Sequence, residues 1–136
     1  MGFRSVLAER YPQCRLVAVV ETREQPERAG ELVSHILRER LQVAGIYNLS
    51  TGDGSIAAAL KAFHCEEKTV FITHELTAER KALLLEGVID AVLDQNPELE
   101  AMTVMKLLAR HFGRNDEKDI RTHTQIGIHL RESCEA

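Results

Sequence analysis

Short β-branched runs alternate with longer helical patterns along almost the whole chain, and this alternation limits the possible folds more than any other feature. The continuous apolar run LVAVV at residues 16–20 is typical of a strand that is covered on both faces. Three further runs predict strands at 44–47, 69–73 and 88–93. In residues 126–130 the apolar positions alternate with polar ones, which predicts a half-exposed or antiparallel strand at an edge.

Helical spacing and cap residues fill the intervals between these strands. Thr77 is placed to cap a helix at its start, and Gly87 is placed to end it. Asn96 and Pro97 form a second cap-plus-proline start. Helices are therefore predicted before Pro12, from Pro26 to Leu41, over 56–63, over 77–87 and over 97–112, with a polar loop at 113–121. This order predicts an α/β fold, a doubly wound and mostly parallel sheet with helices on both faces.

Length and charge exclude several function classes. The chain has 136 residues, which corresponds to one domain, and no apolar run approaches the length of a membrane span. Lys and Arg number 17 against 21 acidic residues, a net charge of −4, which argues against nucleic-acid binding by this chain itself. Cys14, Cys65 and Cys134 are widely separated and odd in number, which favours reduced thiols in a cytoplasmic protein over a disulfide framework or a zinc site.

The predicted topology indicates where a ligand would bind. In doubly wound sheets, ligands lie at the carboxyl ends of the strands. Four segments follow predicted strands, namely Glu21 with Thr22, Asn48 to Gly54, Thr73 to Glu75, and Asp94 to Asn96. The sequence therefore predicts a binding edge composed of these four segments.

Three interpretations of that edge are compatible with its residue types. The loop NLSTGDGS, residues 48–55, has backbone N–H groups ahead of a helix that suit an anion, but it lacks the lysine of a P-loop, and a glycine-permitted turn into a helix is the favoured interpretation. His74, Glu75 and Asp94 have the residue types of an acid–base pair or a metal site, yet no nucleophile motif and no metal-ligand spacing accompany them. The sequence therefore predicts no catalysis, no metal and no cofactor.

Recognition without chemistry is the third interpretation of the edge. Asn48, Glu75 and Gln95 carry amide and carboxylate groups, which donate and accept hydrogen bonds in fixed directions, as a hydroxyl-rich ligand requires. The alternative is that these side chains cap helices and satisfy loop backbone. Both interpretations stay open at the level of the residues.

The sequence also resembles a known family. Residues 70–112 resemble the closing part of the effector-binding core of LacI/GalR-type transcription regulators and of type I periplasmic sugar-binding proteins. The pattern is a strand, an acidic residue, a helix led by threonine, a glycine, a strand and then Gln-x-Pro. Here these elements are Glu75, Thr77, Gly87 and the Gln95-Asn96-Pro97 triplet. Residues 17–63 resemble the preceding units of the same lobe, and residues 2–12 resemble its opening helix.

The resemblance implies a two-lobe protein that closes over a small molecule, with residues 1–136 as the second lobe only. In the intact protein the helix 97–112 would belong to the first lobe, which this chain lacks. Its apolar stripe then needs another partner, so we expect the helix to fold onto its own lobe or to pack against a second copy in a homodimer. The stripe consists of Leu99, Met102, Met105, Leu108 and Phe112.

The resemblance also implies a function. Asn48, His74, Glu75 and Gln95 would contact a small-molecule effector, most naturally a sugar, with Glu75 standing where an aspartate is usual. The chain would be the non-catalytic sensing and dimerisation lobe of a cytoplasmic LacI-type regulator, which contacts DNA only through a headpiece that this chain lacks. Alone, it should bind sugar weakly or not at all.

Two other function classes compete with the regulator. The chain would alternatively be a lobe of a periplasmic sugar-binding protein that serves a transporter. The third possibility is a small doubly wound enzyme or phosphoacceptor module. That module requires an acidic cluster after the first strand and a lysine after the last, and the chain offers only Glu21 and no such lysine.

Overall fold

The computed structural model describes residues 2–39, 42–123 and 125–134. Within these ranges the chain forms six helices and four strands. In chain order they are α1 (Phe3–Arg10), α2 (Pro26–Arg38), β1 (Gly45–Tyr47), α3 (Asp53–Ala62), β2 (Val70–His74), α4 (Ala78–Leu85), β3 (Ala91–Asp94), α5 (Pro97–His111), β4 (Gly127–His129) and α6 (Arg131–Cys134). Leu41, at the predicted end of the second helix, lies outside the described residues.

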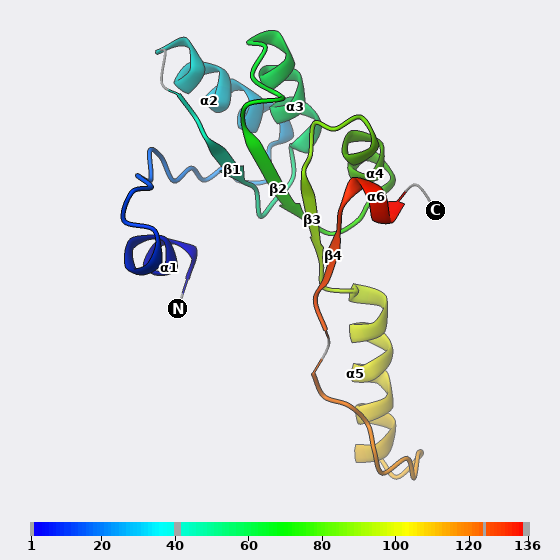
Figure 1. Cartoon of the computed structure of the whole chain (residues 1–136). Coiled ribbons are helices and arrows are strands. Elements are labelled where there is room, and N and C mark those ends of the chain that lie inside the picture. Colours follow the sequence, from blue (N-terminus) through cyan, green and yellow to red (C-terminus); the bar gives the residue numbers. More distant parts are fainter. Residues whose placement is uncertain (1, 40–41, 124, 135–136) are drawn as a thin grey trace.

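The four strands form one sheet in the order β1-β2-β3-β4 (Figure 1). β1, β2 and β3 run parallel, with Ile46 opposite Phe71 and Thr73 opposite Val92. β4 is antiparallel to β3, so the alternating pattern of residues 126–130 correctly predicted an antiparallel edge strand. Because β1, β2 and β3 are parallel neighbours, the loops that follow them leave the sheet at the same edge.

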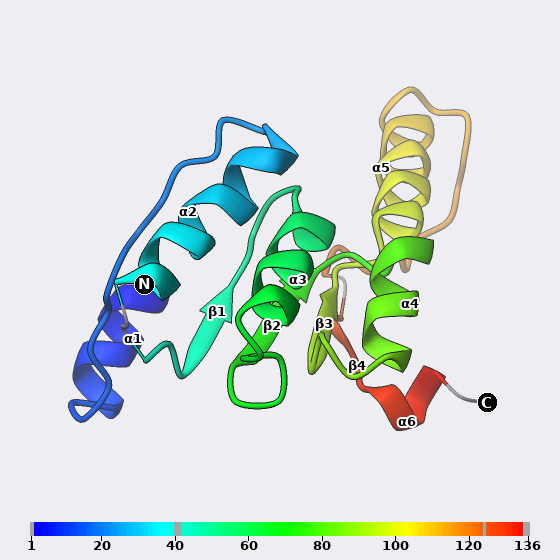
Figure 2. The ribbon, with the colours of Figure 1, turned by 90° about the horizontal axis from the view of Figure 1, so that it is seen from above.

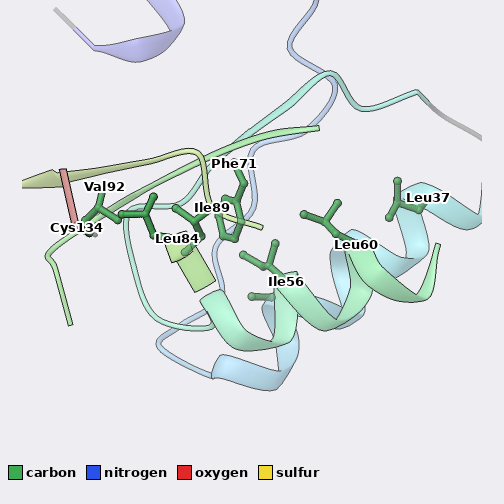
Figure 3. Close-up of a cluster of buried hydrophobic side chains, with 9 residues drawn as sticks. Leu37, Ile56, Leu60, Phe71, Leu84, Ile89, Val92 and Cys134 are labelled. Carbon is green, nitrogen blue, oxygen red and sulfur yellow. The ribbon is translucent and has the colours of Figure 1, made fainter. Parts of the chain in front are cut away.

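The core lies on one side of the sheet, beneath α3 and α4. Phe71 and Val92 point to this side and are fully buried, as are Leu60 of α3 and Leu84 of α4 (Figure 3). Burial of side chains of this size contributes about 1.5–3 kcal/mol each. α2 packs on α3 rather than on the sheet (Figure 2), and a glycine permits the close approach. A Cβ at Gly30 would stand 2.5 Å from the carbonyl oxygen of Ser55.

The opposite side of the sheet is largely uncovered. Val70 and Ile128 are 50% and 64% exposed on this side, where strands of a doubly wound sheet are normally buried. α1 reaches it only at the β1 end, where Phe3 stacks on Tyr47 with ring centroids 5.0 Å apart. The α/β class, the mostly parallel sheet and the single lobe are confirmed, while among the described residues the second helical layer is limited to α1.

Local helix signals are confirmed at several positions. The Thr77 hydroxyl accepts from the Arg80 amide at 3.2 Å, and the Asn96 side chain accepts from the Leu99 amide at 3.1 Å. Gly87 follows α4 with a φ of +78°, and the amide of Val88 donates to the carbonyl of Leu83 at 3.0 Å. This left-handed exit is the one that glycine adopts without strain.

The predicted first strand is wrong. Residues 16–20 form no strand, and Val17, Val19 and Val20 are 42%, 68% and 42% exposed. A strand exists only through hydrogen bonds to a neighbour, and β1 pairs only with β2 within the described residues. The apolar run predicts the ability to form a strand, but no strand among the described residues lies beside it to accept its hydrogen bonds.

α5 projects away from the rest of the molecule (Figures 1 and 2). None of its residues is buried, and its apolar stripe stays exposed to between 45% and 69%. The expectation that this helix folds onto its own lobe is therefore wrong, because the chain leaves β3 at Asn96 in a direction away from the core. Packing against a second copy stays a prediction. No helix among the described residues is both long and apolar enough to cross a membrane.

Candidate functional site

Glu75 and Gln95 lie next to each other in the topology, at the carboxyl ends of β2 and β3. The amide of Glu75 donates to the carbonyl of Leu93 at 2.9 Å, which ties the end of β2 to its neighbour. Gln95 follows β3 directly and is exposed. The sequence-based prediction that both residues share one edge of a parallel sheet is therefore confirmed.

Both segments contain a residue in the left-handed region of the backbone map. Glu75 has a φ of +62° and Asn96, next to Gln95, a φ of +56°. Residues other than glycine rarely adopt this conformation, and such strain gathers at sites that the surrounding structure holds in place. Within the described ranges, neither the Glu75 carboxylate nor the Gln95 amide group has a hydrogen-bond or ion-pair partner, so both remain available to a ligand.

Asn48 follows β1 at the same edge, but its side chain is used within its own loop. It is 9% exposed, and its amide nitrogen donates to Asp53 Oδ1 at 2.9 Å and to the Ser50 carbonyl at 3.2 Å. Its oxygen accepts from the Ser50 amide at 3.3 Å. The loop-satisfying interpretation of Asn48 thus describes these contacts, and a role in ligand binding stays a prediction.

His74 belongs to an aromatic cluster that sequence reasoning missed. Its Nε2 lies 2.6 Å from the hydroxyl oxygen of Tyr47, and the two rings are 5.4 Å apart and tilted. Phe3 of α1 also stacks on Tyr47. The register contains the signal, because Tyr47 pairs with Ile72, and His74 follows two residues later on the same side of the sheet.

A buried ion pair at this edge was also missed. Arg80 of α4 contacts Asp53 of α3 through Nε and Nη2, each 2.7 Å from Oδ2. The side chains are 12% and 3% exposed. Asp53 stands directly after Gly52, which is the N-cap of α3 and has a φ of +98°. An acidic residue in the first turn of a helix was visible in the sequence, but its partner 27 residues away was not.

The remaining predicted segment does not join the edge. Glu21 and Thr22 follow no strand, so the topology that would bring them to the site is absent. Two surface hollows lie elsewhere on the molecule. One of about 290 Å³ lies between α1 and residues 14–16, and one of about 520 Å³ lies at the opposite end of α3 and α4. Within the described part of the chain, no three His, Cys, Asp or Glu side chains are grouped to hold a metal ion.

Comparison with solved structures finds the same fold in several proteins. A glucose-galactose binding protein from Geobacillus stearothermophilus is 25% identical, with a TM-score of 0.76 over 87% of this chain. A carbohydrate transporter solute binding protein from Agrobacterium radiobacter, in complex with D-arabinose, is 16% identical, with a TM-score of 0.80 over 96%. A putative LacI transcriptional regulator from Bacteroides fragilis is 19% identical, with a TM-score of 0.75 over 98%.

This chain spans less than half of each of these proteins, namely 42%, 44% and 46% of their lengths. No curated protein sequence matches it. The family model described as periplasmic binding protein domain matches residues 1–115. With that match over most of its length, the chain belongs to the periplasmic binding protein domain family.

Proposed function

We propose that this chain is the second lobe of a two-lobe binding core and that its carboxyl edge forms one wall of a sugar site. The observation that carries the proposal is the pair Glu75 and Gln95, whose polar groups have no partner in the described structure and follow neighbouring strands. The chain also matches somewhat less than half of a glucose-galactose binding protein and of a carbohydrate transporter solute binding protein. Asn48 and His74 complete the set of residues that we place at this wall.

The chemistry of the edge suits a ligand with several hydroxyl groups. A carboxylate accepts hydrogen bonds from hydroxyl groups, and a primary amide both donates and accepts. The Tyr47 ring beside His74 supplies apolar surface next to these polar groups, which is the combination that small-molecule sites use. Glu75 and Gln95 need no catalytic partner to form these hydrogen bonds, so the function that we propose is binding.

Within this function we favour the effector-sensing lobe of a cytoplasmic LacI-type regulator. Cys14, Cys65 and Cys134 are all free thiols, which favours a reducing compartment. The regulator from Bacteroides fragilis matches nearly the whole chain. Effector binding would bias lobe closure, and a homodimer would relay the change to a DNA-binding headpiece outside this chain.

The second candidate is a lobe of a periplasmic sugar-binding protein that serves a transporter. The structures named as sugar-binding or solute-binding proteins favour it. The coding sequence upstream of this chain separates the two candidates. A helix-turn-helix segment there supports the regulator, and a signal peptide supports the transport protein.

The sugar proposal is tested by nuclear magnetic resonance titration of this chain with D-galactose, D-glucose and D-arabinose. Because one wall makes only part of the contacts, we expect a Kd of about 1 mM or weaker, with shifts at the amides of residues 74–76 and 94–96. Glu75→Gln should weaken the response, and Glu67→Gln, an exposed glutamate at the opposite edge, should not. Micromolar binding, or shifts centred on Glu67, would refute the proposal.

A further inference from the structure

Arg80 joins three separate segments at the proposed binding edge. Besides its ion pair with Asp53, its Nη2 donates to the carbonyl of Ser50 at 2.8 Å, and its Nη1 donates to the carbonyl of Glu75 at 3.2 Å. One guanidinium therefore fixes the loop after β1 and the loop after β2 to the start of α3. Only arginine has three nitrogens in a rigid plane that reach three directions at once.

The ion pair is placed where it contributes position more than stability. Both side chains are buried, and desolvation of two charges offsets much of their attraction. The second oxygen of Asp53 accepts from Asn48 at 2.9 Å, so both carboxylate oxygens have partners, one from the loop after β1 and one from α4. A buried network with satisfied partners favours one arrangement of its loops over others.

The backbone of Glu75 is held on both sides by this arrangement. Its carbonyl accepts from Arg80 and, at 3.0 Å, from the amide of Thr77, while its own amide donates to Leu93. These bonds retain Glu75 in the left-handed conformation that a residue with a Cβ adopts only under strain. The carboxylate is left out of the network and is free to meet a ligand.

We infer that Arg80, anchored by Asp53, is a positioning residue that holds Glu75 in its strained conformation and aligns it with the loop of residues 48–53. It acts through Glu75 and needs no contact with the ligand. The assignment deepens the proposed function, because positioning Glu75 matters to binding only if Glu75 binds the sugar. The coupling of the two loops, however, is measurable without any sugar.

The test separates the charge of Arg80 from its bridging geometry. Arg80→Lys retains a cation for Asp53 but lacks the planar group that reaches both carbonyls. We expect its urea midpoint to stay near that of the parent chain, while amide exchange at Ser50 and Thr77 becomes about tenfold faster. The exposed Arg38→Lys is the matched control and should change neither measurement. Unchanged exchange at both amides in Arg80→Lys would overturn the inference.

A second background tests the strain itself. Glycine adopts a φ of +62° without strain, so Glu75→Gly removes what Arg80 is inferred to hold. In that background, Arg80→Lys should accelerate exchange at Thr77 by less than about twofold. An equal tenfold acceleration in both backgrounds would show that Arg80 does not act through Glu75. If Arg80→Lys does not fold, the neutral double variant Asp53→Asn/Arg80→Gln, which buries no charge, gives the same measurement.

The sugar titration completes the experiment. With D-galactose, D-glucose and D-arabinose as probes, Arg80→Lys should weaken the shifts at residues 74–76 about as strongly as Glu75→Gln does. A full sugar response in Arg80→Lys would overturn the positioning role. If exchange changes as expected but the sugar shifts of the parent chain centre on Glu67 instead of residues 74–76, the proposed sugar function fails and the coupling by Arg80 stands.

Discussion

Thr73 tests how much a buried hydroxyl group lowers the stability of the core of this lobe. It lies in β2, is fully buried, and its hydroxyl has no hydrogen-bond partner among the described residues. A buried polar group without a partner costs about 1–3 kcal/mol of stability. Valine has nearly the same shape, retains the β-branch that strands favour and carries no hydroxyl. Thr73→Val should therefore raise the free energy of unfolding by about 1–2 kcal/mol.

A second threonine provides the matched control. Thr69 is equally buried, but its hydroxyl donates to the carbonyl of Val43 at 2.9 Å. Thr69→Val removes that bond and should lower the free energy of unfolding by about 1 kcal/mol. Urea unfolding followed by circular dichroism measures the free energy of unfolding of both variants, and the m value should stay unchanged. In thermal unfolding, each kcal/mol should move Tm by about 3–5 °C. The reasoning is refuted if the two substitutions shift stability in the same direction, or if Thr73→Val destabilises.

Three further expectations follow from particular contacts. Gly30→Ala should destabilise by about 1–3 kcal/mol in urea unfolding because its Cβ meets backbone of α3, whereas Gly54→Ala, whose Cβ meets only the flexible end of a side chain, should be nearly neutral. Asn96→Ala removes the cap of α5 and should speed amide exchange in that helix without moving the global unfolding midpoint, because α5 has no buried residue. The hydrogen bond and charge of Lys106 lower the pKa of Glu117. This contact is therefore fully present above the usual glutamate pKa and is lost as the pH falls through the lowered pKa. In Lys106→Gln, the pKa of Glu117, measured from carboxyl carbon chemical shifts, should return toward its usual value.

Signals that act within a few residues were predictable from the sequence. The caps Thr77 and Asn96 and the exit at Gly87 each depend on a hydrogen bond or a φ angle that spans at most four residues. These local preferences are the same in any fold. They located α4 and α5 to within a residue or two, and β2 before α4 and β3 after it followed from the apolar runs.

Structure that depends on a distant neighbour was predictable only in part. The run at residues 16–20 has the composition of a buried strand, yet it stays exposed because no described strand lies beside it. The stripe of α5 was visible, but whether a helix packs on its own domain depends on the direction in which the chain leaves β3. Neither direction nor neighbour is encoded within such a segment.

The candidate site has features that the sequence predicts and features that only the structure reveals. Topology alone placed Glu75 and Gln95 at one edge, because parallel neighbours end on the same side. The same argument assigned Asn48 to the ligand, although its amide is used by Asp53 and Ser50. The position of a residue at a strand end therefore shows whether it can reach the site. The hydrogen bonds of its polar atoms decide whether it is free to bind a ligand. Arg80 shows the converse, since its place in the first turn of α4 carries no such signal and only its contacts reveal what it holds.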